Sequence, residues 1–562
     1  MRLLILAALL AVHLLSVPLT LWEFDETFFA LGVERYEPLL HHPPPPGYPL
    51  FIGFAKLVHA FTGDPFRALI VVSVLATACG IAALYAALRR ISGDDDIALF
   101  ATVLFYVSPV MLVHGVVGMS DSGALALLAL SLWLSCREGH HVTDFALACA
   151  ATVGWRPQFS IVVVPLLLLT IARRHSWKER LTAIGVFGAA CLAWLVPLMM
   201  AAGGATNFVQ WLGGQAAYFA AHDADLSRSG MSHAQVAFRF IAHPWGPKYL
   251  SFVVLLAAAA GVVLAMRARV WRTLPLAIAC AIYLAFAIVT MDPADAPRYA
   301  LPSMIAVALF AAWPLARLRA AGWIALALYA AGAYVYTSPI LVERRSQPSP
   351  PVAAARFIER TAPRNAVILY DLPLRPHAEY LLRDRPHLRI DEGFARYGRR
   401  IDVPLVLYAD GETKGTSFAW RASDAYGKLT RNFYRVVTVS TIGMNERYAA
   451  VRGIFAPERS RTGESWRWLG PNAELSLPDI AASRVRLTFR LPPESVLDAN
   501  AINVGSTSIN VARGATATIE VPFAPNLTIT AARSFVPAET GGSRDRRRLS
   551  VMLLGVEQTG RR

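Results

Sequence analysis

Three carboxylate side chains, Glu23, Asp25 and Glu26, lie within four residues of each other, directly after the first apolar segment of the chain. Ionisable groups at the edge of an apolar helical bundle are costly to bury, so they are candidates for function. The helical spacing from Asp25 through Phe29 to Gly32 predicts that Asp25 faces the bundle. Alternatively, the acids only mark the boundary with water, and the residues alone leave both interpretations open.

A further acid, Asp121, stands between Ser120 and Ser122 at the start of a later apolar run. Ser120 or Asp121 can cap the N-terminus of a helix there. Asp121 could instead bind a metal ion or orient a substrate hydroxyl, and the capping and binding roles are compatible.

Three cations, Arg156, Lys248 and Arg298, lie at the same predicted level as these acids. A guanidinium group suits phosphate because it donates paired, charge-assisted hydrogen bonds. The alternative is that these long side chains only extend their charged ends to the membrane interface. Acids and cations that meet on one face of a lipid-accessible bundle would suit a reaction between a lipid phosphate and a water-borne partner.

Apolar helices must position these residues. The chain has 562 residues, of which 55% are hydrophobic and 17% charged, against about 25% charged in soluble domains. Runs of about 17–25 apolar residues, long enough to cross a bilayer core of about 30 Å, repeat over residues 1–340. We predict a polytopic α-helical membrane domain with about eleven spans, at residues 3–21, 65–88, 97–114, 121–136, 142–156, 157–172, 181–200, 247–266, 273–290, 299–316 and 322–339. The short fifth and sixth spans could instead form a re-entrant pair.

Short loops rich in Lys and Arg predict the orientation, because such loops stay in the cytoplasm. They follow the spans that end near residues 88, 136, 172, 266 and 316, and Arg2 lies on the same side. The first apolar run resembles a signal peptide, but no small-x-small cleavage site follows it, so we expect it to remain as a span. The basic side, which includes Arg2, places the N-terminus in the cytoplasm, and an odd number of spans then places the C-terminal region outside.

Two long outer loops, at residues 22–64 and 201–246, contain apolar stretches too short to cross the membrane. One stretch, residues 48–61, follows the Pro-rich turn at 43–47. We predict that it forms a helix lying in the membrane interface. These loops could cover a cavity at the outer leaflet.

The C-terminal region has the composition of a soluble protein and begins after a Pro-rich linker at residues 347–351. Residues 352–456 alternate helical and strand patterns and predict an extracytoplasmic α/β subdomain. Residues 457–562 include the strictly alternating segment 484–491, which predicts a β-sandwich-like subdomain.

The chain carries a formal charge of +15, but no nucleic-acid-binding motif accompanies it. We therefore expect contact with anionic lipid headgroups or acidic glycans and no nucleic-acid partner. The five cysteines all lie in or beside apolar runs, so no disulfide framework is predicted.

The order of these pieces resembles the GT-C superfamily of polyprenyl-phosphate-sugar glycosyltransferases. Within it, the chain is similar to bacterial relatives of protein O-mannosyltransferases and of the lipid A aminoarabinose transferase. The segments that carry the resemblance are residues 24–29, 42–50, 120–122 and 297–302. The resemblance covers residues 1–340, and its most specific part is the Asp-Glu segment joined to the Pro-rich turn and the following helix.

The resemblance implies an inverting transfer of sugar to an acceptor hydroxyl, on the periplasmic face of a bacterial inner membrane. Asp25 matches the catalytic base, with Glu26 beside it, and takes the acceptor proton. Cations would stabilise the departing polyprenyl phosphate. The residues implied for substrate binding are Asp121, Arg298, Tyr299, Lys248, Arg156, His42 and Tyr48.

Metal use is left open by the resemblance, and Asp25 and Asp121 are the candidate ligands if a divalent ion binds. The implied partners are a polyprenyl-phosphate-linked sugar donor, an acceptor protein, lipid or glycan, and membrane lipids. Two other functions fit the composition. One is a flippase or transporter for a lipid-linked sugar, although no internal repeat supports it. The other is a non-catalytic membrane assembly protein.

Overall fold

The computed structural model describes residues 1–561, except 138–140, 175, 223–230, 412–416, 426, 428, 431–434, 460–463 and 541–544. The chain divides into two compact units. The first unit comprises residues 1–349 together with 423–433, and the second comprises residues 350–422 and 434–562. A short stretch of the C-terminal region thus belongs to the N-terminal unit.

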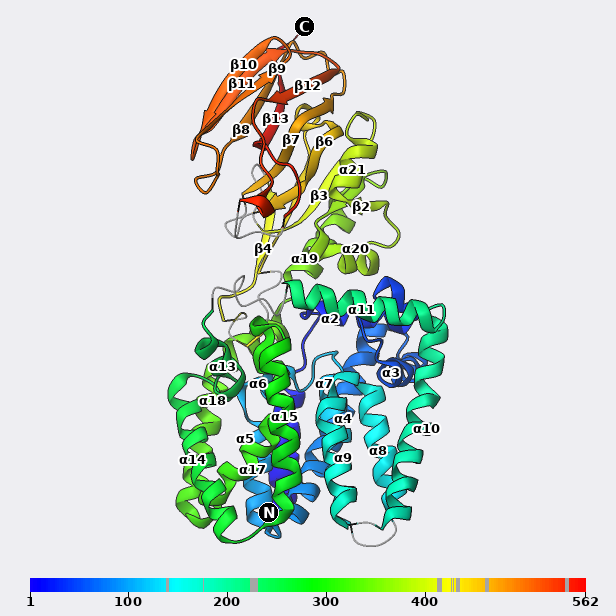
Figure 1. Ribbon diagram of the computed structural model, residues 1–562, viewed down its shortest axis with the longest axis vertical. Coiled ribbons are helices and arrows are strands. Elements are labelled where there is room, and N and C mark those ends of the chain that lie inside the picture. Colours follow the sequence, from blue (N-terminus) through cyan, green and yellow to red (C-terminus); the bar gives the residue numbers. More distant parts are fainter. Residues whose placement is uncertain are drawn as a thin grey trace. The chain divides into compact units, whose positions relative to one another are not determined.

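The N-terminal unit is helical (Figure 1). Its first half contains α1 (Arg2–Leu14), α2 (Phe24–Glu34), α3 (Pro49–Thr62), α4 (Pro65–Ser92), α5 (Asp95–Tyr106), α6 (Pro109–His114), α7 (Asp121–Ser135), α8 (Val142–Trp155) and α9 (Ser160–Arg174). Its second half contains α10 (Trp177–Ala201), α11 (Ala205–His222), α13 (His233–Ile241), α14 (Lys248–Arg267), α15 (Leu274–Thr290), α16 (Ala296–Tyr299), α17 (Leu301–Arg317) and α18 (Ala320–Ser346). Short 3-10 turns precede several helices, among them η2 (Pro157–Phe159), η4 (Trp271–Thr273) and η5 (Pro293–Asp295).

Each of the eleven predicted spans coincides with helix, but fewer helices are long enough to cross a membrane. Within the described residues, five helices are long and apolar enough to cross a membrane. The bent pair Pro293–Tyr299 and Leu301–Arg317 would be a sixth if the two helices form one span. The first predicted span, 3–21, is helical only over α1, because the chain leaves the helix before Pro18. The third is broken at Ser108 into α5 and α6. The structure therefore confirms a polytopic helical bundle but does not establish eleven spans.

Close packing between helices forms the core of this unit. A Cβ atom on Gly261 of α14 would lie 1.7 Å from the backbone oxygen of Phe310 in α17. Only glycine allows this approach, which is typical of helices packed within a membrane. The predicted interfacial stretch 48–61 is helix α3, joined to α2 by edge-to-face contacts of Phe29 with Tyr48 and Phe51.

The second unit begins with α19 (Pro350–Thr361) and a five-stranded sheet in the order β2-β1-β3-β5-β4. The strands are β1 (Val367–Tyr370), β2 (His387–Arg389), β3 (Leu405–Asp410), β4 (Ser417–Arg421) and β5 (Val436–Thr441). β1 pairs parallel with both β2 and β3, and the remaining pairs are antiparallel. The short helices α20 (Arg375–Leu381) and α21 (Ile390–Tyr397) connect these strands, as the alternating pattern predicts.

Eight further strands form one antiparallel sheet in the order β10-β9-β12-β7-β13-β8-β11, with β6 also paired to β7. They are β6 (Ala449–Arg459), β7 (Ser465–Ser476), β8 (Arg484–Arg490), β9 (Ala499–Val504), β10 (Thr507–Ala512), β11 (Thr516–Pro522), β12 (Asn526–Ala531) and β13 (Met552–Thr559). Alternate residues of β8, including Val485, Leu487 and Phe489, are buried in a common core.

The strands are joined by hydrogen bonds in one order, and the strands at its two ends, β10 and β11, bury side chains in the same core, in agreement with the β-sandwich-like prediction. One detail differs from the sequence prediction. The predicted boundary between residues 456 and 457 falls inside β6, because this strand starts at Ala449 and pairs along β7.

Candidate functional site

Helix α2 presents the predicted base, and Glu26 fixes the start of that helix. Glu26 Oε2 accepts hydrogen bonds from the backbone N–H groups of Trp22 (2.6 Å) and Glu23 (2.8 Å). Glu26 Oε1 accepts a third from the backbone N–H of Gly118 (2.6 Å), in the loop before α7. The side chain is fully buried. Both oxygens of Glu26 are therefore occupied, which suits a residue that positions Asp25 and does not suit the catalytic role expected for Glu26.

We predict that Glu26→Ala destabilises the protein. Three buried backbone N–H groups would lose their acceptor. Each buried donor left without a hydrogen bond lowers the free energy of unfolding by about 1–3 kcal/mol. Melting of the purified protein, followed by tryptophan fluorescence, should shift to lower temperature. The matched control is Glu37→Ala, at a partly exposed acid paired with exposed Arg35, and it should melt like the wild type. An unchanged melting temperature combined with lost activity would contradict the positioning role.

The first charged cluster of the site joins Asp25 to the segment before α17. Arg298 Nη2 lies 3.6 Å from Asp25 Oδ2 and 3.2 Å from Asp295 Oδ2. The same nitrogen donates to the hydroxyl of Tyr299 (3.3 Å). The guanidinium of Arg298 is buried and shared among these neighbours. The sequence hypothesis requires Asp25 and Arg298 to meet, and they do.

The second charged cluster joins α7 to the end of α8. Arg156 Nη2 lies 3.3 Å from Asp121 Oδ1, and Arg156 Nη1 donates to Ser120 Oγ (2.7 Å). The guanidinium also lies 6.0 Å from the ring centre of Tyr48, whose hydroxyl accepts a hydrogen bond from Gln158 (2.9 Å). Asp121 Oδ2 is buried and has no hydrogen-bond partner among the described residues. One acceptor atom of this cluster is thus available to a ligand.

Asp25 differs from the other acids of the site in its exposure. Its side chain is 27% exposed, against 3% for Asp121 and 9% for Asp295. Burial raises the pKa of Asp25 above its usual value, and nearby Arg298 acts in the opposite direction. Arg156 and Asp121 also influence the pKa of Asp25, so the two clusters share one electrostatic environment. Asp25 is the acid most accessible to a substrate.

Two predicted residues do not join these clusters. Lys248 is the exposed first residue of α14, and within the described part of the chain no ion pair or hydrogen bond connects it to Asp25, Asp121, Arg156 or Arg298. His42 is buried in the turn after α2, where its backbone pairs with Glu37 and its ring faces Phe28. His42 thus shapes the Pro-rich turn.

A third charged pair was missed by the sequence analysis. Arg344, at the end of α18, is buried and pairs with Glu23, and its Nη1 donates to the backbone oxygen of Val113 (3.0 Å). This pair ties the residue before α2 to α6 and α18. In the sequence, Arg344 follows the last apolar run and looks like an ordinary boundary charge. Asp295 pairs with Arg298, which follows it by three residues. This spacing puts both side chains on the same side of a helical turn, so the pair could have been found from the sequence.

The donor set does not fit a divalent ion held by the protein. Among the described residues, no group of three or more His, Cys, Asp or Glu side chains could hold a metal. Asp25 and Asp121, the candidate ligands, each face an arginine. A cation bound there would be repelled by these guanidinium groups.

Comparison with known proteins adds independent information. The family model described as dolichyl-phosphate-mannose-protein mannosyltransferase matches residues 41–201, a range that contains Tyr48, Asp121 and Arg156. A comparison with curated proteins finds no match.

Two crystal structures of ArnT from Cupriavidus metallidurans are similar in fold. The apo structure matches with a TM-score of 0.54 and 15% identity, over 78% of this chain and 97% of that chain. The structure bound to undecaprenyl phosphate matches with a TM-score of 0.51 and 14% identity, over the same shares of the two chains. At these identities the likeness concerns the fold, and it confirms the architecture that the sequence resemblance implied.

Proposed function

We propose that this chain, whose fold is similar to that of ArnT, is an inverting glycosyltransferase that uses a polyprenyl-phosphate sugar donor. The observation that carries the proposal is the distance of 3.6 Å between Asp25 Oδ2 and Arg298 Nη2. It puts a partly exposed carboxylate, able to take a proton, beside a buried guanidinium, able to bind a phosphate. A single displacement at a sugar phosphate needs both groups.

The reaction proceeds in one displacement. Asp25 accepts the proton of an acceptor hydroxyl while the hydroxyl oxygen forms a bond to the anomeric carbon of the sugar. The bond between that carbon and the phosphate oxygen breaks, and the electron pair leaves with the polyprenyl phosphate. The anomeric carbon passes through an oxocarbenium-like state, and its configuration inverts.

Arg298 stabilises the negative charge that grows on the leaving phosphate. Its Nη2 is shared among neighbours, and its buried Nε has no hydrogen-bond partner within the described residues, so the group retains donor capacity for a phosphate oxygen. When the phosphate draws the guanidinium toward itself, Asp25 loses part of its ion pair and becomes a stronger base.

The cluster of Asp121 and Arg156 orients the bound sugar or acceptor. Asp121 Oδ1 faces Arg156, whereas Oδ2 is available as an acceptor for a sugar hydroxyl. Leaving such a buried acceptor unpaired is costly, so a ligand hydroxyl at this position gains binding energy. Arg156 fixes the carboxylate and the ring of Tyr48 in place.

The comparisons support a lipid-linked donor. One structure of similar fold, that of ArnT, holds undecaprenyl phosphate. The description of the matching family names dolichyl-phosphate mannose. The acceptor in this proposal is a hydroxyl of a protein, a lipid or a glycan. The several apolar helices make this a multi-pass membrane protein. We place it in a bacterial inner membrane with Asp25 and the C-terminal unit on the periplasmic side.

The second candidate function is a flippase for the same lipid-linked sugar, which the buried charged clusters could also bind. Purified protein in liposomes, supplied with a radiolabelled polyprenyl-phosphate sugar and acceptors from membrane extract, separates the two. A glycosyltransferase yields labelled acceptor and free polyprenyl phosphate. Movement of the label across the bilayer with no labelled acceptor would overturn the proposal in favour of the flippase.

A further inference from the structure

His114, the last residue of α6, is a buried histidine that no step of the proposed reaction uses. Its Nε2 lies 3.4 Å from the backbone oxygen of Leu429. Its Nδ1 is also buried and has no hydrogen-bond partner among the described residues. Buried polar atoms in folded proteins normally have a partner, so this nitrogen has the capacity for one more hydrogen bond.

The two neighbours of His114 in the chain connect α6 to the candidate site. The backbone oxygen of Val113 accepts a hydrogen bond from Arg344 (3.0 Å), which belongs to the buried charged pair before α2. The backbone oxygen of Gly115 accepts a hydrogen bond from Ser122 Oγ (2.6 Å), in the first turn of α7. The end of α6 is therefore tied to the segments that begin α2 and α7, which carry the acids of the site.

Charged groups of the site act on the His114 ring. Arg344, Arg298 and Asp121 all contribute to the electrostatic potential at the ring. Such contributions fall with distance, so the ring lies in the same buried region as the two charged clusters. His114 thus shares the environment in which the donor binds in the proposed reaction.

A ring nitrogen without a partner does not by itself mark a binding site, because His13 of α1 has one too. His13 is fully buried, its Nε2 lies 3.0 Å from the backbone oxygen of Tyr106, and its Nδ1 has no partner within the described chain. Burial and this one contact are the influences described for the His13 ring. The charged groups around His114 therefore distinguish the two histidines, and His13 is a matched control.

The carbonyl of Leu429 fixes the chemical character of Nδ1 in His114. The ring is neutral beside the guanidinium groups of Arg344 and Arg298, since they repel a further positive charge. A carbonyl oxygen can only accept a hydrogen bond, so Nε2 carries the proton of the neutral ring. Nδ1 then has a lone pair and acts as an acceptor. Its complement is a hydroxyl group, because an ionised phosphate oxygen has no proton to donate.

Leu429 is itself held in the helical unit. It is almost fully buried and lies, with Ser423, in the stretch after β4 that belongs to this unit. The backbone N–H and the hydroxyl of Ser423 donate to the two carboxylate oxygens of Glu343, in the last turn of α18 (2.7 Å each). The carbonyl that orients the His114 ring is therefore part of a packed segment.

We propose that His114 is a sugar-binding residue, an inference that rests on the proposed function. Its Nδ1 accepts a hydrogen bond from a hydroxyl of the donor sugar, and the Leu429 carbonyl positions the ring. Asp121 Oδ2 is a second buried acceptor without a hydrogen-bond partner among the described residues. The two acceptors are complementary to two free hydroxyl groups on one sugar, while Arg298 binds the phosphate.

Binding of lipids to the purified full chain tests the proposal separately from transfer. Undecaprenyl phosphates that carry mannose, glucose, galactose or arabinose compete with fluorescent undecaprenyl phosphate, and the one that binds the wild type most tightly is the sugar-bearing probe. His114→Ala should weaken binding of this probe about tenfold, the effect of one hydrogen bond. It should leave binding of sugar-free undecaprenyl phosphate unchanged. His13→Ala, which opens a cavity of the same size, should bind both lipids like the wild type.

Two further variants separate sugar binding from a structural role. The carboxamide of Asn reaches the position of Nδ1, whereas that of Gln reaches the position of Nε2. His114→Asn should keep part of the binding of the sugar-bearing probe, because its oxygen replaces the acceptor. His114→Gln should bind this probe as weakly as His114→Ala, although it keeps a donor for Leu429. Recovery in His114→Gln but not in His114→Asn would mean that His114 only holds Leu429, and it would overturn the proposal.

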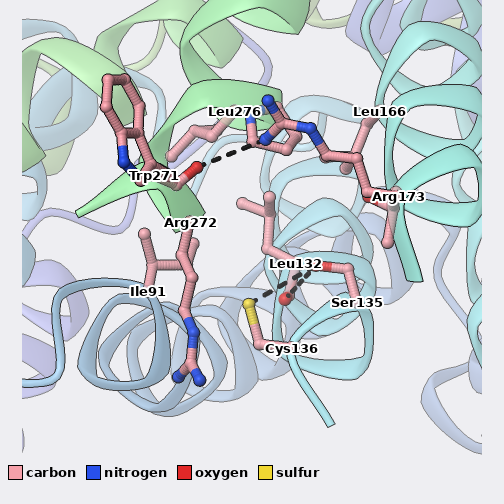
Figure 2. Close-up of a pocket in the computed structure, with 11 residues that line it drawn as sticks. Ile91, Leu132, Ser135, Cys136, Leu166, Arg173, Trp271, Arg272 and Leu276 are labelled. Carbon is pink, nitrogen blue, oxygen red and sulfur yellow. Dashed lines mark hydrogen bonds between the residues drawn. The ribbon is translucent and has the colours of Figure 1, made fainter. Parts of the chain in front are cut away.

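The far end of α7 supplies a control that is remote from His114. Ser135 and Leu132 line a cavity there (Figure 2). Its volume of about 230 Å³ is below the usual range of ligand sites, about 300–1,000 Å³. The fifteen residues of α7 separate Ser135 from the start of the helix by roughly 20 Å. Ser135→Ala should therefore bind both lipids like the wild type.

The remaining outcomes distinguish this proposal from the proposed function. If the wild type prefers the sugar-bearing probe to the sugar-free lipid and His114→Ala keeps that preference, the role of His114 is wrong while the proposed function stands. If the wild type prefers none of the sugar-bearing lipids, both proposals fail. Equal loss of binding in His114→Ala and His13→Ala would assign the effect to packing and would also overturn the role of His114.

Discussion

Asp25→Asn lowers the rate of sugar transfer by about 10²- to 10⁴-fold, the usual contribution of a positioned general base, while the protein remains folded. The substitution keeps the size of the side chain and removes the atom that takes the acceptor proton. Asp25 is partly exposed, and within the described residues its side chain forms an ion pair with Arg298 and no hydrogen bond, so the substitution breaks no buried hydrogen-bond network. Turnover of a radiolabelled polyprenyl-phosphate sugar with excess donor and acceptor measures the effect.

The matched control for this variant is Glu34→Gln, which neutralises an acid at the opposite end of the same helix. It should transfer sugar at the wild-type rate. Transfer by Asp25→Asn at close to the wild-type rate would remove Asp25 as the base. Loss of transfer in both variants would indicate that the charge of α2, and no single carboxylate, is what the reaction requires.

Arg298→Ala lowers the rate of transfer by about 10²- to 10³-fold, comparable to the removal of one preorganised donor from a developing anion. Arg298→Lys should retain part of the activity, because an ammonium group keeps the charge but not the paired hydrogen bonds. The effect should fall on use of the donor, since the phosphate is part of the donor alone. Initial rates are measured with varied donor concentration at a fixed acceptor concentration, and then with varied acceptor concentration at a fixed donor concentration. The two series separate an effect on donor use from an effect on acceptor use.

The pH profile of Arg298→Ala gives a second readout of the same contact. The Arg298 guanidinium lowers the pKa of Asp25, whereas burial raises it. Removing the arginine should therefore raise the pKa of Asp25 further. Because the base acts in its ionised form, the acidic limb of the rate profile should move to higher pH in this variant.

Arg35→Ala is the matched control for Arg298→Ala. Arg35 is an exposed cation at the end of α2 that pairs with Glu37 outside the two clusters. The Arg35→Ala variant should change neither the dependence of the rate on donor concentration nor the acidic limb of the pH profile. Unchanged donor kinetics in Arg298→Ala would contradict the leaving-group role, and an unshifted acidic limb would show that Asp25 is not the group that titrates.

The proposed catalytic clusters explain why Asp121, Arg156, Asp295 and Arg298 are buried in a bundle whose core is mostly apolar. Breaking a buried ion pair costs about 3–5 kcal/mol because it leaves an uncompensated charge. Asp121, Arg156, Arg298 and Asp295 are each held in such a pair. The clusters are thus preorganised before any substrate enters, which electrostatic stabilisation of a transition state requires.

The sequence by itself determined where helices and strands form. Apolar runs of membrane length became α4, α10 and α14, and the alternating residues 484–491 became a strand with one buried face. These patterns depend on neighbours within a few turns or residues, so they can be read locally. Asp25 and Arg298 were also singled out this way, because charged groups beside apolar runs stand out in any window, whereas the role of Asp25 as a base came from the resemblance to a family.

The tertiary structure alone decided which charged groups meet and which only support the fold. Glu26 bonds to Gly118 across 92 positions, and Arg344 pairs with Glu23 across 321. No local pattern encodes such contacts, because they depend on how complete helices pack. Packing therefore separated Asp25, which remains partly exposed beside Arg298, from the adjacent Glu26, whose oxygens are bound by backbone N–H groups.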